Sequence, residues 1–198
     1  MSNDEVNQGR RRFLTGMTCA VGAVGVAGAA IPFVGSWYPS AKAKAAGAPV
    51  KVNISKLEPG QMMTAEWRGK PVYVVRRTQQ TLDNLSKLTD KLRDPNSEES
   101  NQPEYVDPRN RASKPEYLIL VGLCTHLGCA PMYRPEVGAE DLGGDSWLGG
   151  FFCPCHGSKF DLAGRVFKGV PAPTNLEVPP YTYETDAVVT IGVDKETA

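Results

Sequence analysis

The chain has 198 residues, with 22 basic and 22 acidic side chains and no net charge at pH 7. This length suits one domain plus an extra segment. A balanced charge gives no sign of nucleic-acid binding, which depends on a basic surface. The 20 glycines and 16 prolines favour a turn-rich, mainly β fold over a helical bundle.

The N-terminal part combines an export address with an apolar segment. Residues 10–14 read R-R-R-F-L and resemble the twin-arginine export signal. No charged residue follows until Lys42. Residues 13–38 are long enough, at about 1.5 Å per residue, to span a hydrocarbon core of about 30 Å. We therefore expect a cytoplasmic N-terminus with the signal in residues 1–12, and a transmembrane anchor in residues 13–38.

A cleaved signal peptide is the alternative interpretation, because residues 41–43 and 43–45 both read A-K-A and fit a cleavage site. The span is longer than an ordinary signal peptide's apolar region, which favours a retained anchor. Cys19 lies within the span, where we interpret it as a small apolar filler. Residues 39–49 are mostly Ala and Lys between two prolines, so they predict a linker. Composition leaves open whether it is a passive spacer or a hinge.

Residues 50–198 predict an antiparallel β domain with one helical insertion. A leucine recurs every three or four residues from 82 to 92, which indicates one face of a helix ending before Pro95. Residues 96–114 are polar and contain proline, so we expect a surface loop. Apolar, β-branched or aromatic runs predict strands at 50–54, 71–76, 117–123, 147–152, 181–183 and 187–193.

Both histidines and four of the five cysteines fall in two short runs. The first motif, residues 124–129, reads C-T-H-L-G-C, and the second motif, residues 153–158, reads C-P-C-H-G-S. Each follows a predicted strand. Histidine and cysteine are ligands that transition metals prefer. In each motif a Cys and a His lie close enough to bind one centre, and a second cysteine remains. Such a set suits either zinc or an iron–sulfur cluster.

The pair of motifs is similar to the two cluster-binding loops of Rieske iron–sulfur proteins. It most resembles the iron–sulfur subunits of cytochrome bc-type quinol oxidoreductases, and the resemblance covers anchor, linker, loops and C-terminal strands. It implies a Rieske domain at residues 50–198 with one [2Fe-2S] cluster as cofactor. By the same resemblance, Cys124 and Cys153 bind one iron of the cluster, and His126 and His156 bind the other.

The resemblance also implies roles for residues beside the ligands. A disulfide between Cys129 and Cys155 ties the two loops together, and an oxidising compartment permits it. Ser158 donates its hydroxyl to a bridging sulfide and raises the reduction potential of the cluster. Leu127 lies at the docking surface, and residues 169–173, which read G-V-P-A-P, form a proline loop that covers the cluster.

One position departs from the pattern of many relatives. Two residues after Ser158 they carry a tyrosine whose hydroxyl donates to the sulfur of a ligand cysteine, whereas this chain has Phe160. Hydrogen bonds to sulfur stabilise the reduced cluster. We therefore expect a lower reduction potential than in the tyrosine-bearing relatives.

The resemblance implies the electron-transfer subunit of a respiratory or photosynthetic quinol–cytochrome c oxidoreductase. Such a subunit accepts one electron and a proton from quinol at the oxidation site of cytochrome b and passes the electron to a c-type cytochrome. His126 and His156 then act as catalytic residues, and residues 39–49 serve as a hinge. Expected partners are both cytochromes, quinol and the membrane, in a dimeric complex without nucleic acid. The expected location is the bacterial inner membrane, with the cluster domain on the periplasmic side.

Three other interpretations fit part of the pattern. A structural zinc module needs ligands of the same kinds and performs no redox chemistry. A Rieske oxygenase or its soluble ferredoxin typically lacks the anchor and the second cysteine of each loop, and this chain has both. The small subunit of an arsenite-oxidase-like enzyme can carry an export signal and Rieske loops. The long anchored layout and the helical insertion favour the quinol oxidoreductase.

Overall fold

A computed structural model describes residues 7–194 of the chain. The chain divides into two compact units, Met1–Ala45 and Ala46–Ala198. Residues 1–6 of the expected cytoplasmic segment and residues 195–198 of the expected Rieske domain lie outside the described residues.

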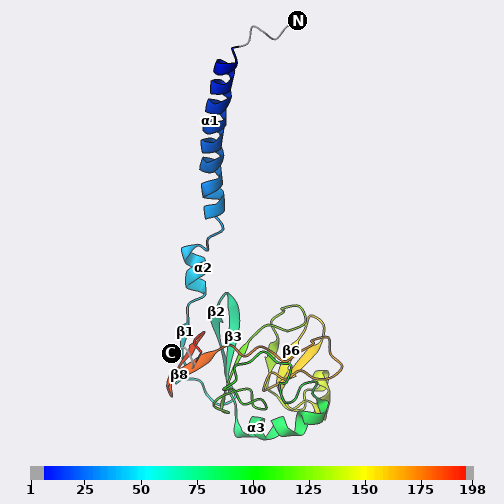
Figure 1. Cartoon of the computed structure of the whole chain (residues 1–198). Coiled ribbons are helices and arrows are strands. Elements are labelled where there is room, and N and C mark those ends of the chain that lie inside the picture. Colours follow the sequence, from blue (N-terminus) through cyan, green and yellow to red (C-terminus); the bar gives the residue numbers. More distant parts are fainter. Residues whose placement is uncertain (1–6, 195–198) are drawn as a thin grey trace. The chain divides into compact units, whose positions relative to one another are not determined.

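The first unit is dominated by one long helix, α1 (Gln8–Gly35), drawn in blue in Figure 1. It begins where the side chain of Asn7 accepts a hydrogen bond from the backbone N–H of Arg10, at 3.0 Å. By length and composition it is able to cross a membrane. The helix continues through Pro32 and ends at Gly35, so it stops before residue 38, where the predicted span ends.

A second, short helix lies within the predicted linker. This helix, α2 (Ala41–Ala46), consists of alanine and lysine, which are good helix formers. The Ser40 hydroxyl oxygen accepts a hydrogen bond from the backbone N–H of Ala43, at 3.1 Å. The segment is therefore partly helical. A helix of six residues is too short to show a recurring apolar pattern in the sequence.

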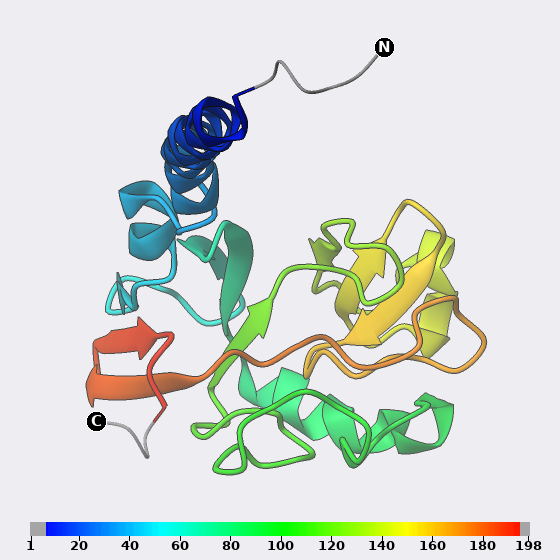
Figure 2. The same ribbon diagram turned by 45° about the horizontal axis from the view of Figure 1, so that its top comes forward.

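The second unit contains three antiparallel sheets of three strands each, with strand orders β1-β9-β8, β2-β3-β4 and β5-β6-β7. In Figures 1 and 2 the sheet with β6 lies on the opposite side of β3 from β8. This arrangement confirms a mainly β fold. The strands are β1 (Val50–Asn53), β2 (Met62–Trp67), β3 (Lys70–Arg76), β4 (Tyr117–Val121), β5 (Met132–Arg134), β6 (Gly150–Cys153), β7 (Ser158–Asp161), β8 (Tyr181–Thr185) and β9 (Val188–Ile191).

Three of these strands, β2, β5 and β7, were not predicted, and β6 begins three residues later than expected. Strand β5 has only three residues, and β7 begins on Ser158, the last residue of the second motif. Both form by pairing with β6, so that Met132 lies opposite Phe152 and Ser158 opposite Cys153. These strands form because they pair with β6, and not because their own sequences alternate between apolar and polar residues.

The helical insertion confirms one expectation and corrects another. An α-helix, α3 (Gln79–Leu85), passes into a 3₁₀-helix, η2 (Ser86–Lys91), so the prediction of one continuous helix to residue 92 was wrong. The hydroxyls of Ser86 and Thr89 donate to carbonyl oxygens three residues earlier, which suits the tighter 3₁₀ turn. The leucines at 85, 88 and 92 are all buried, as the pattern predicts. The two consecutive helices are labelled α3 and drawn in green in Figure 1.

Residues 96–114 form an irregular loop, but the prediction that it lies at the surface holds only in part. Val106 and Arg111 within it are buried. The Arg111 guanidinium donates to Gln102 Oε1 at 3.0 Å and to the carbonyl oxygen of Gly164 at 3.3 Å. The long polar side chain of Arg111 thus fixes the loop to the interior. The polar composition of the loop does not indicate this contact.

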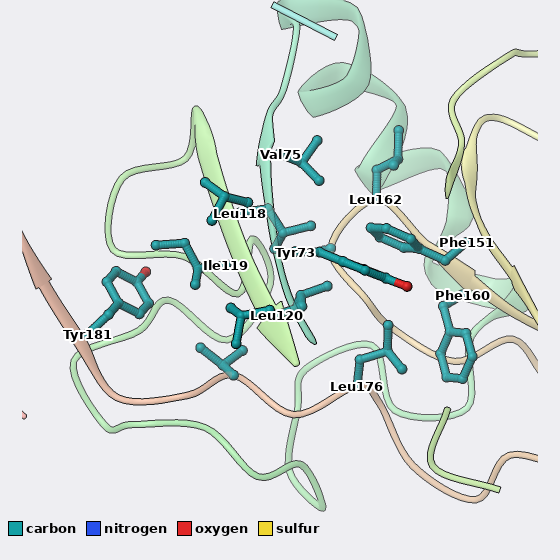
Figure 3. Packing of buried hydrophobic residues seen from close by; sticks show 14 of the residues in the cluster. Tyr73, Val75, Leu118, Ile119, Leu120, Phe151, Phe160, Leu162, Leu176 and Tyr181 are labelled. Carbon is teal, nitrogen blue, oxygen red and sulfur yellow. The ribbon is translucent and has the colours of Figure 1, made fainter. Parts of the chain in front are cut away.

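The core joins the sheets at the base of the two motifs that contain cysteine and histidine. The Tyr73 ring from β3 stacks on the Phe151 ring from β6, with centroids 5.9 Å apart (Figure 3). Leu118, Ile119 and Leu120 of β4 are fully buried, although neighbouring side chains of a strand point to opposite faces. Strand β4 is therefore covered on both faces. Both motifs continue from buried strands, which gives them a rigid base.

Candidate metal centre

The two motifs are built as the same kind of loop. The first lies between β4 and β5, and the second is the turn of the β6–β7 hairpin. The N–H of Gly128 donates to the carbonyl oxygen of Cys124 at 2.8 Å, and the N–H of Gly157 donates to that of Cys153 at 2.9 Å. Both glycines have positive φ, 78° and 76°, a conformation that glycine adopts readily. Each motif therefore turns sharply just after its histidine.

Four side chains that the sequence singled out form two neighbouring pairs. Cys124 and Cys153 are free thiols, only 3% and 2% exposed, and they lie within hydrogen-bond reach of each other. The rings of His126 and His156 have centroids 4.8 Å apart and are nearly perpendicular, at 87°. His126 is half-buried and His156 is exposed. The thiols thus occupy the buried side of the centre, and the imidazoles are open to solvent.

The surroundings of Cys153 act on its thiol in opposite directions. Burial raises the pKa of this thiol, the backbone N–H groups of Cys155 and His156 lower it in part, and the neighbouring Cys124 thiol raises it further, so that the pKa is raised on balance. A metal ligand must be the deprotonated thiolate. With a metal in place of the proton, the backbone N–H groups beside Cys153 would favour the negative charge of its thiolate.

The predicted disulfide between Cys129 and Cys155 is confirmed, with Cα atoms 6.8 Å apart. The sulfur atoms of Cys129, Cys153 and Cys155 all lie within 4.8 Å of one another. Because two of the three are joined in the disulfide, only Cys153 in this group offers a thiolate. The crosslink therefore joins the two motifs directly beside the ligands.

The proline loop, residues 169–173, is bonded to the second motif, and the residue that follows the loop, Thr174, is bonded to the first. Ser158 is fully buried, and its Oγ accepts a hydrogen bond from the N–H of Ala172 at 3.1 Å. The Ser158 hydroxyl keeps its own proton to donate elsewhere. In the first motif, the hydroxyl of Thr125 donates to the carbonyl oxygen of Thr174 at 2.7 Å. Thr125 was not among the residues predicted from the sequence, although a hydroxyl residue between two metal-ligand candidates is itself a signal.

Tyr73 contacts the chain on both sides of the first motif, and it was not predicted from the sequence. Its hydroxyl donates to the carbonyl oxygen of Pro131 at 3.0 Å. Its ring packs so closely on Gly122 that a Cβ there would collide with it. Tyr73 lies 58 residues from Pro131 in the sequence. Nothing near the motif in the sequence indicates this contact.

Two further residues show opposite environments. Leu127, between His126 and Gly128, is 70% exposed at the tip of the first motif. Phe160 is fully buried and shares a face of β7 with Ser158, because side chains alternate along a strand. Leu127 is therefore an apolar side chain open to solvent, whereas Phe160 packs in the interior.

The donor set fits a Rieske cluster, in which two histidines replace two cysteines on one iron. The family described as "Rieske [2Fe-2S] domain" matches residues 49–181. The chain belongs to the Rieske iron–sulfur protein family. The cofactor of a Rieske protein is one [2Fe-2S] cluster. A second description, "Ubiquitinol-cytochrome C reductase Fe-S subunit TAT signal", matches residues 1–40 of this Rieske protein, where the twin-arginine pattern and α1 lie.

Curated relatives extend the similarity over the whole Rieske protein. The ubiquinol-cytochrome c reductase iron-sulfur subunit of Allochromatium vinosum is 57% identical over 198 residues, covering 100% of this chain and 95% of the relative. The subunit of the same name from Rhodospirillum rubrum is 45% identical, with 92% and 91% covered. The mitochondrial Rieske subunit of the cytochrome b-c1 complex from Theropithecus gelada is 39% identical, and the match covers 96% of this chain and 63% of that relative.

Proposed function

We propose that this chain is the electron-transfer subunit of a membrane quinol–cytochrome c oxidoreductase. It takes one electron and a proton from quinol at the oxidation site of a cytochrome b, and it passes the electron to a c-type cytochrome. The names of the Allochromatium and Rhodospirillum relatives, both iron-sulfur subunits of ubiquinol-cytochrome c reductase, support this reaction.

The observation that carries the proposal is the contrast between buried thiols and open imidazoles. We assign Cys124 and Cys153 to one iron, and His126 and His156 to the other. Burial of the thiols keeps water from the sulfur side of the centre. The exposed His156 and the half-buried His126 are open to a docked partner. Leu127 beside them adds an apolar contact for docking.

The chemistry follows from this ligand set. When bound, the [2Fe-2S] cluster supplies a one-electron couple whose potential is raised by the two neutral imidazoles. Each imidazole uses one ring nitrogen as a ligand and keeps the other to hold a proton. His126 and His156 therefore have the chemistry to receive the proton that leaves quinol with the electron.

The N-terminal unit supports a place in the membrane. The apolar helix α1 and the match to a twin-arginine signal fit a membrane-anchored Rieske subunit. Arginines ahead of the apolar run put the N-terminus in the cytoplasm and the cluster domain in the periplasm. Residues 39–49 serve as the hinge that lets the domain reach both cytochromes within a dimeric complex.

The test is isolation of the chain from membranes with its partners intact. An affinity tag on this chain, with mild detergent, is expected to recover a di-haem cytochrome b and a c-type cytochrome. The preparation is expected to reduce cytochrome c with quinol. Replacing Cys124 by serine should abolish the cluster and this activity, whereas Cys19→Ser, within α1, should preserve both.

Metal content and partners provide the contradicting outcomes. Two iron atoms per chain and an EPR signal on reduction are expected. Bound zinc without iron would instead indicate a structural module. Recovery of a partner that oxidises arsenite, without cytochrome b, would indicate an arsenite-oxidase-like assembly.

A further inference from the structure

One arginine outside both motifs holds the proline loop. Arg93 follows η2, and its side chain extends over residues 170–173. One guanidinium nitrogen, Nη1, donates to the carbonyl oxygens of Ala172 and Pro173 at 3.2 and 3.1 Å. The other, Nη2, donates to the carbonyl oxygen of Val170 at 3.4 Å. A single planar fork thus contacts three carbonyl groups of one short loop.

The backbone of Arg93 is itself fixed in place. Its N–H donates to the carbonyl oxygen of Val166 at 3.0 Å. The residues on either side, Leu92 and Asp94, are buried, and Leu92 pairs with Phe167 in an isolated bridge. The guanidinium is exposed, but it extends from an anchored segment that lies beside the start of the loop.

The end of the loop is held by the same segment. The Asn175 amide nitrogen donates to the carbonyl oxygen of Asp94 at 2.9 Å and to Ser100 Oγ at 2.7 Å. The Asn175 side-chain oxygen accepts the N–H of Val166 at 2.8 Å. With Asn175 buried, the exit of the loop is fixed, and Arg93 holds its middle.

The loop connects this arginine to the metal centre through one residue. The carbonyl oxygen of Ala172 accepts from Arg93, and its N–H donates to Ser158 Oγ at 3.1 Å. A hydroxyl that accepts one hydrogen bond becomes a stronger and better oriented donor of its own proton. The loop position therefore controls how well Ser158 donates to the centre.

We propose that Arg93 is a positioning residue for the cluster: it holds residues 170–173 against Ser158 and so keeps the Ser158 hydroxyl oriented as a donor. This inference rests on the proposed function, because it takes Ser158 to face the cluster. The sequence gives no hint of this role, since Arg93 lies 77 to 80 residues from the carbonyl groups that it binds.

The test uses the full chain with its cluster in detergent. Arg93→Ala removes both the fork and the charge, and Arg93→Lys keeps the charge without the fork. Lys168→Ala is the matched control: Lys168 lies just before the loop, and its Nζ donates only to the carbonyl oxygen of Asp90 among the bonds described, at 3.0 Å. The control removes a nearby cation without releasing a loop carbonyl. The readouts are hydrogen exchange of the peptide containing Ala172 and the reduction potential.

In Arg93→Ala, we expect the Ala172 amide to exchange about tenfold faster, because local opening is easier. We expect electron binding to weaken about tenfold, which equals about 59 mV for a one-electron couple. The Arg93→Lys variant should show most of both changes, since an ammonium cannot span three carbonyl groups. Lys168→Ala should match the unmodified protein in both measurements.

Two results would overturn the inference. One is an unchanged exchange rate and potential in Arg93→Ala. The other is an unmodified potential in Arg93→Lys, which would show that charge alone matters. If Arg93→Ala fails to retain its cluster, the inference is tested by the reduction potential of Arg93→Lys and by the exchange rate of the Ala172 amide in that variant. Failure of the proposed function would appear differently, as missing iron or missing cytochrome partners in the unmodified protein.

Discussion

In the proposed centre, hydrogen-bond donors around the sulfur atoms affect how readily the cluster accepts an electron. Reduction adds negative charge, and each donor to sulfur stabilises that charge. The backbone N–H groups of Cys155 and His156 lower the pKa of Cys153, and the N–H of Ala172 donates to Ser158 Oγ. Phe160, on the same face of β7 as Ser158, adds no donor. A tyrosine at this position would supply one.

Phe160→Tyr is therefore expected to raise the reduction potential. A hydrogen bond to a charged group is worth about 1.5–3 kcal/mol, and a tenfold change corresponds to about 59 mV, so the rise should be on the order of 60 mV or more. An EPR-monitored redox titration measures it. Phe152→Tyr is the control. Phe152 pairs with Lys159, so its side chain lies on the other face of the sheet from Phe160 and Ser158. An unchanged potential in Phe160→Tyr would contradict the expectation.

A buried ion pair stabilises the strand that follows the second motif. Arg165 Nη2 lies 2.7 Å from Asp161 Oδ2, and both side chains are almost completely buried. The same guanidinium donates to the carbonyl oxygens of Leu85 at 2.8 Å and Pro95 at 3.2 Å. The pair thus joins the end of β7 to the helical insertion.

Asp161→Asn is expected to lower the free energy of unfolding by about 3–5 kcal/mol, because it leaves a buried guanidinium without its counter-charge. Urea denaturation of the full chain in detergent, followed by the visible absorbance of the cluster, measures the effect. Glu184→Gln is the control: its partner Lys51 is 68% exposed, and such pairs contribute about 0–1 kcal/mol. Equal losses in the two variants would contradict the role of the buried pair.

The individual residues of the centre could be predicted only where they are concentrated in the sequence. Both motifs carry their chemistry within six residues, so the candidate ligands and the confirmed disulfide cysteines were named from the sequence. Tyr73 and Arg93 could not be named, because each reaches the centre across more than fifty residues. Contacts of that kind exist only once the sheets have assembled.

Among the elements, the disulfide between the two motifs is the one covalent tie described at the centre. It joins cysteines 26 residues apart. In a chain-entropy view such a crosslink contributes about 3 kcal/mol, mainly by restricting the unfolded chain. It also resists separation of the two loops that carry the ligands.

Replacing Cys129 and Cys155 together by alanine should therefore lower the temperature at which the cluster is lost. Loss of visible absorbance on heating measures this temperature. Cys19→Ala is the matched control, because this exposed cysteine lies in α1 and takes no part in either motif. If the double variant and the control lose the cluster at the same temperature, the crosslink does not stabilise the centre.

Elements were predictable where a local period exists, and unpredictable where pairing creates the structure. The apolar run of β4 and the leucine spacing of the insertion are local signals, and both correspond to buried faces. The short strands β5 and β7 depend on β6. The α-helix passes into a 3₁₀-helix at Ser86, where the hydroxyls of Ser86 and Thr89 donate to the backbone, and apolar spacing does not distinguish these two helix types.

The proposed function requires the cluster domain to move between two partners. Residues 39–49 connect the two units, and α2 occupies six of these residues. Replacing Ala41, the first residue of α2, and Ala48, which follows α2, by proline restricts the backbone of this segment without interrupting the helix. Glycine at the same positions leaves it free and serves as the control.

We expect the proline variants to reduce cytochrome c severalfold more slowly with quinol, because domain movement becomes limiting. Reduction of the cluster itself by quinol should remain fast. The glycine variants should behave like the unmodified complex in steady-state assays. Unchanged turnover in the proline variants would argue against the hinge.

In the proposed function, this centre takes electrons directly from quinol. This transfer is measured by freeze-quench EPR of the isolated complex, mixed with quinol for a single turnover. The expected result is that the cluster and the haem of cytochrome b become reduced together, one electron each. A cluster that stays oxidised with quinol, and is reduced only by dithionite, would contradict the claim.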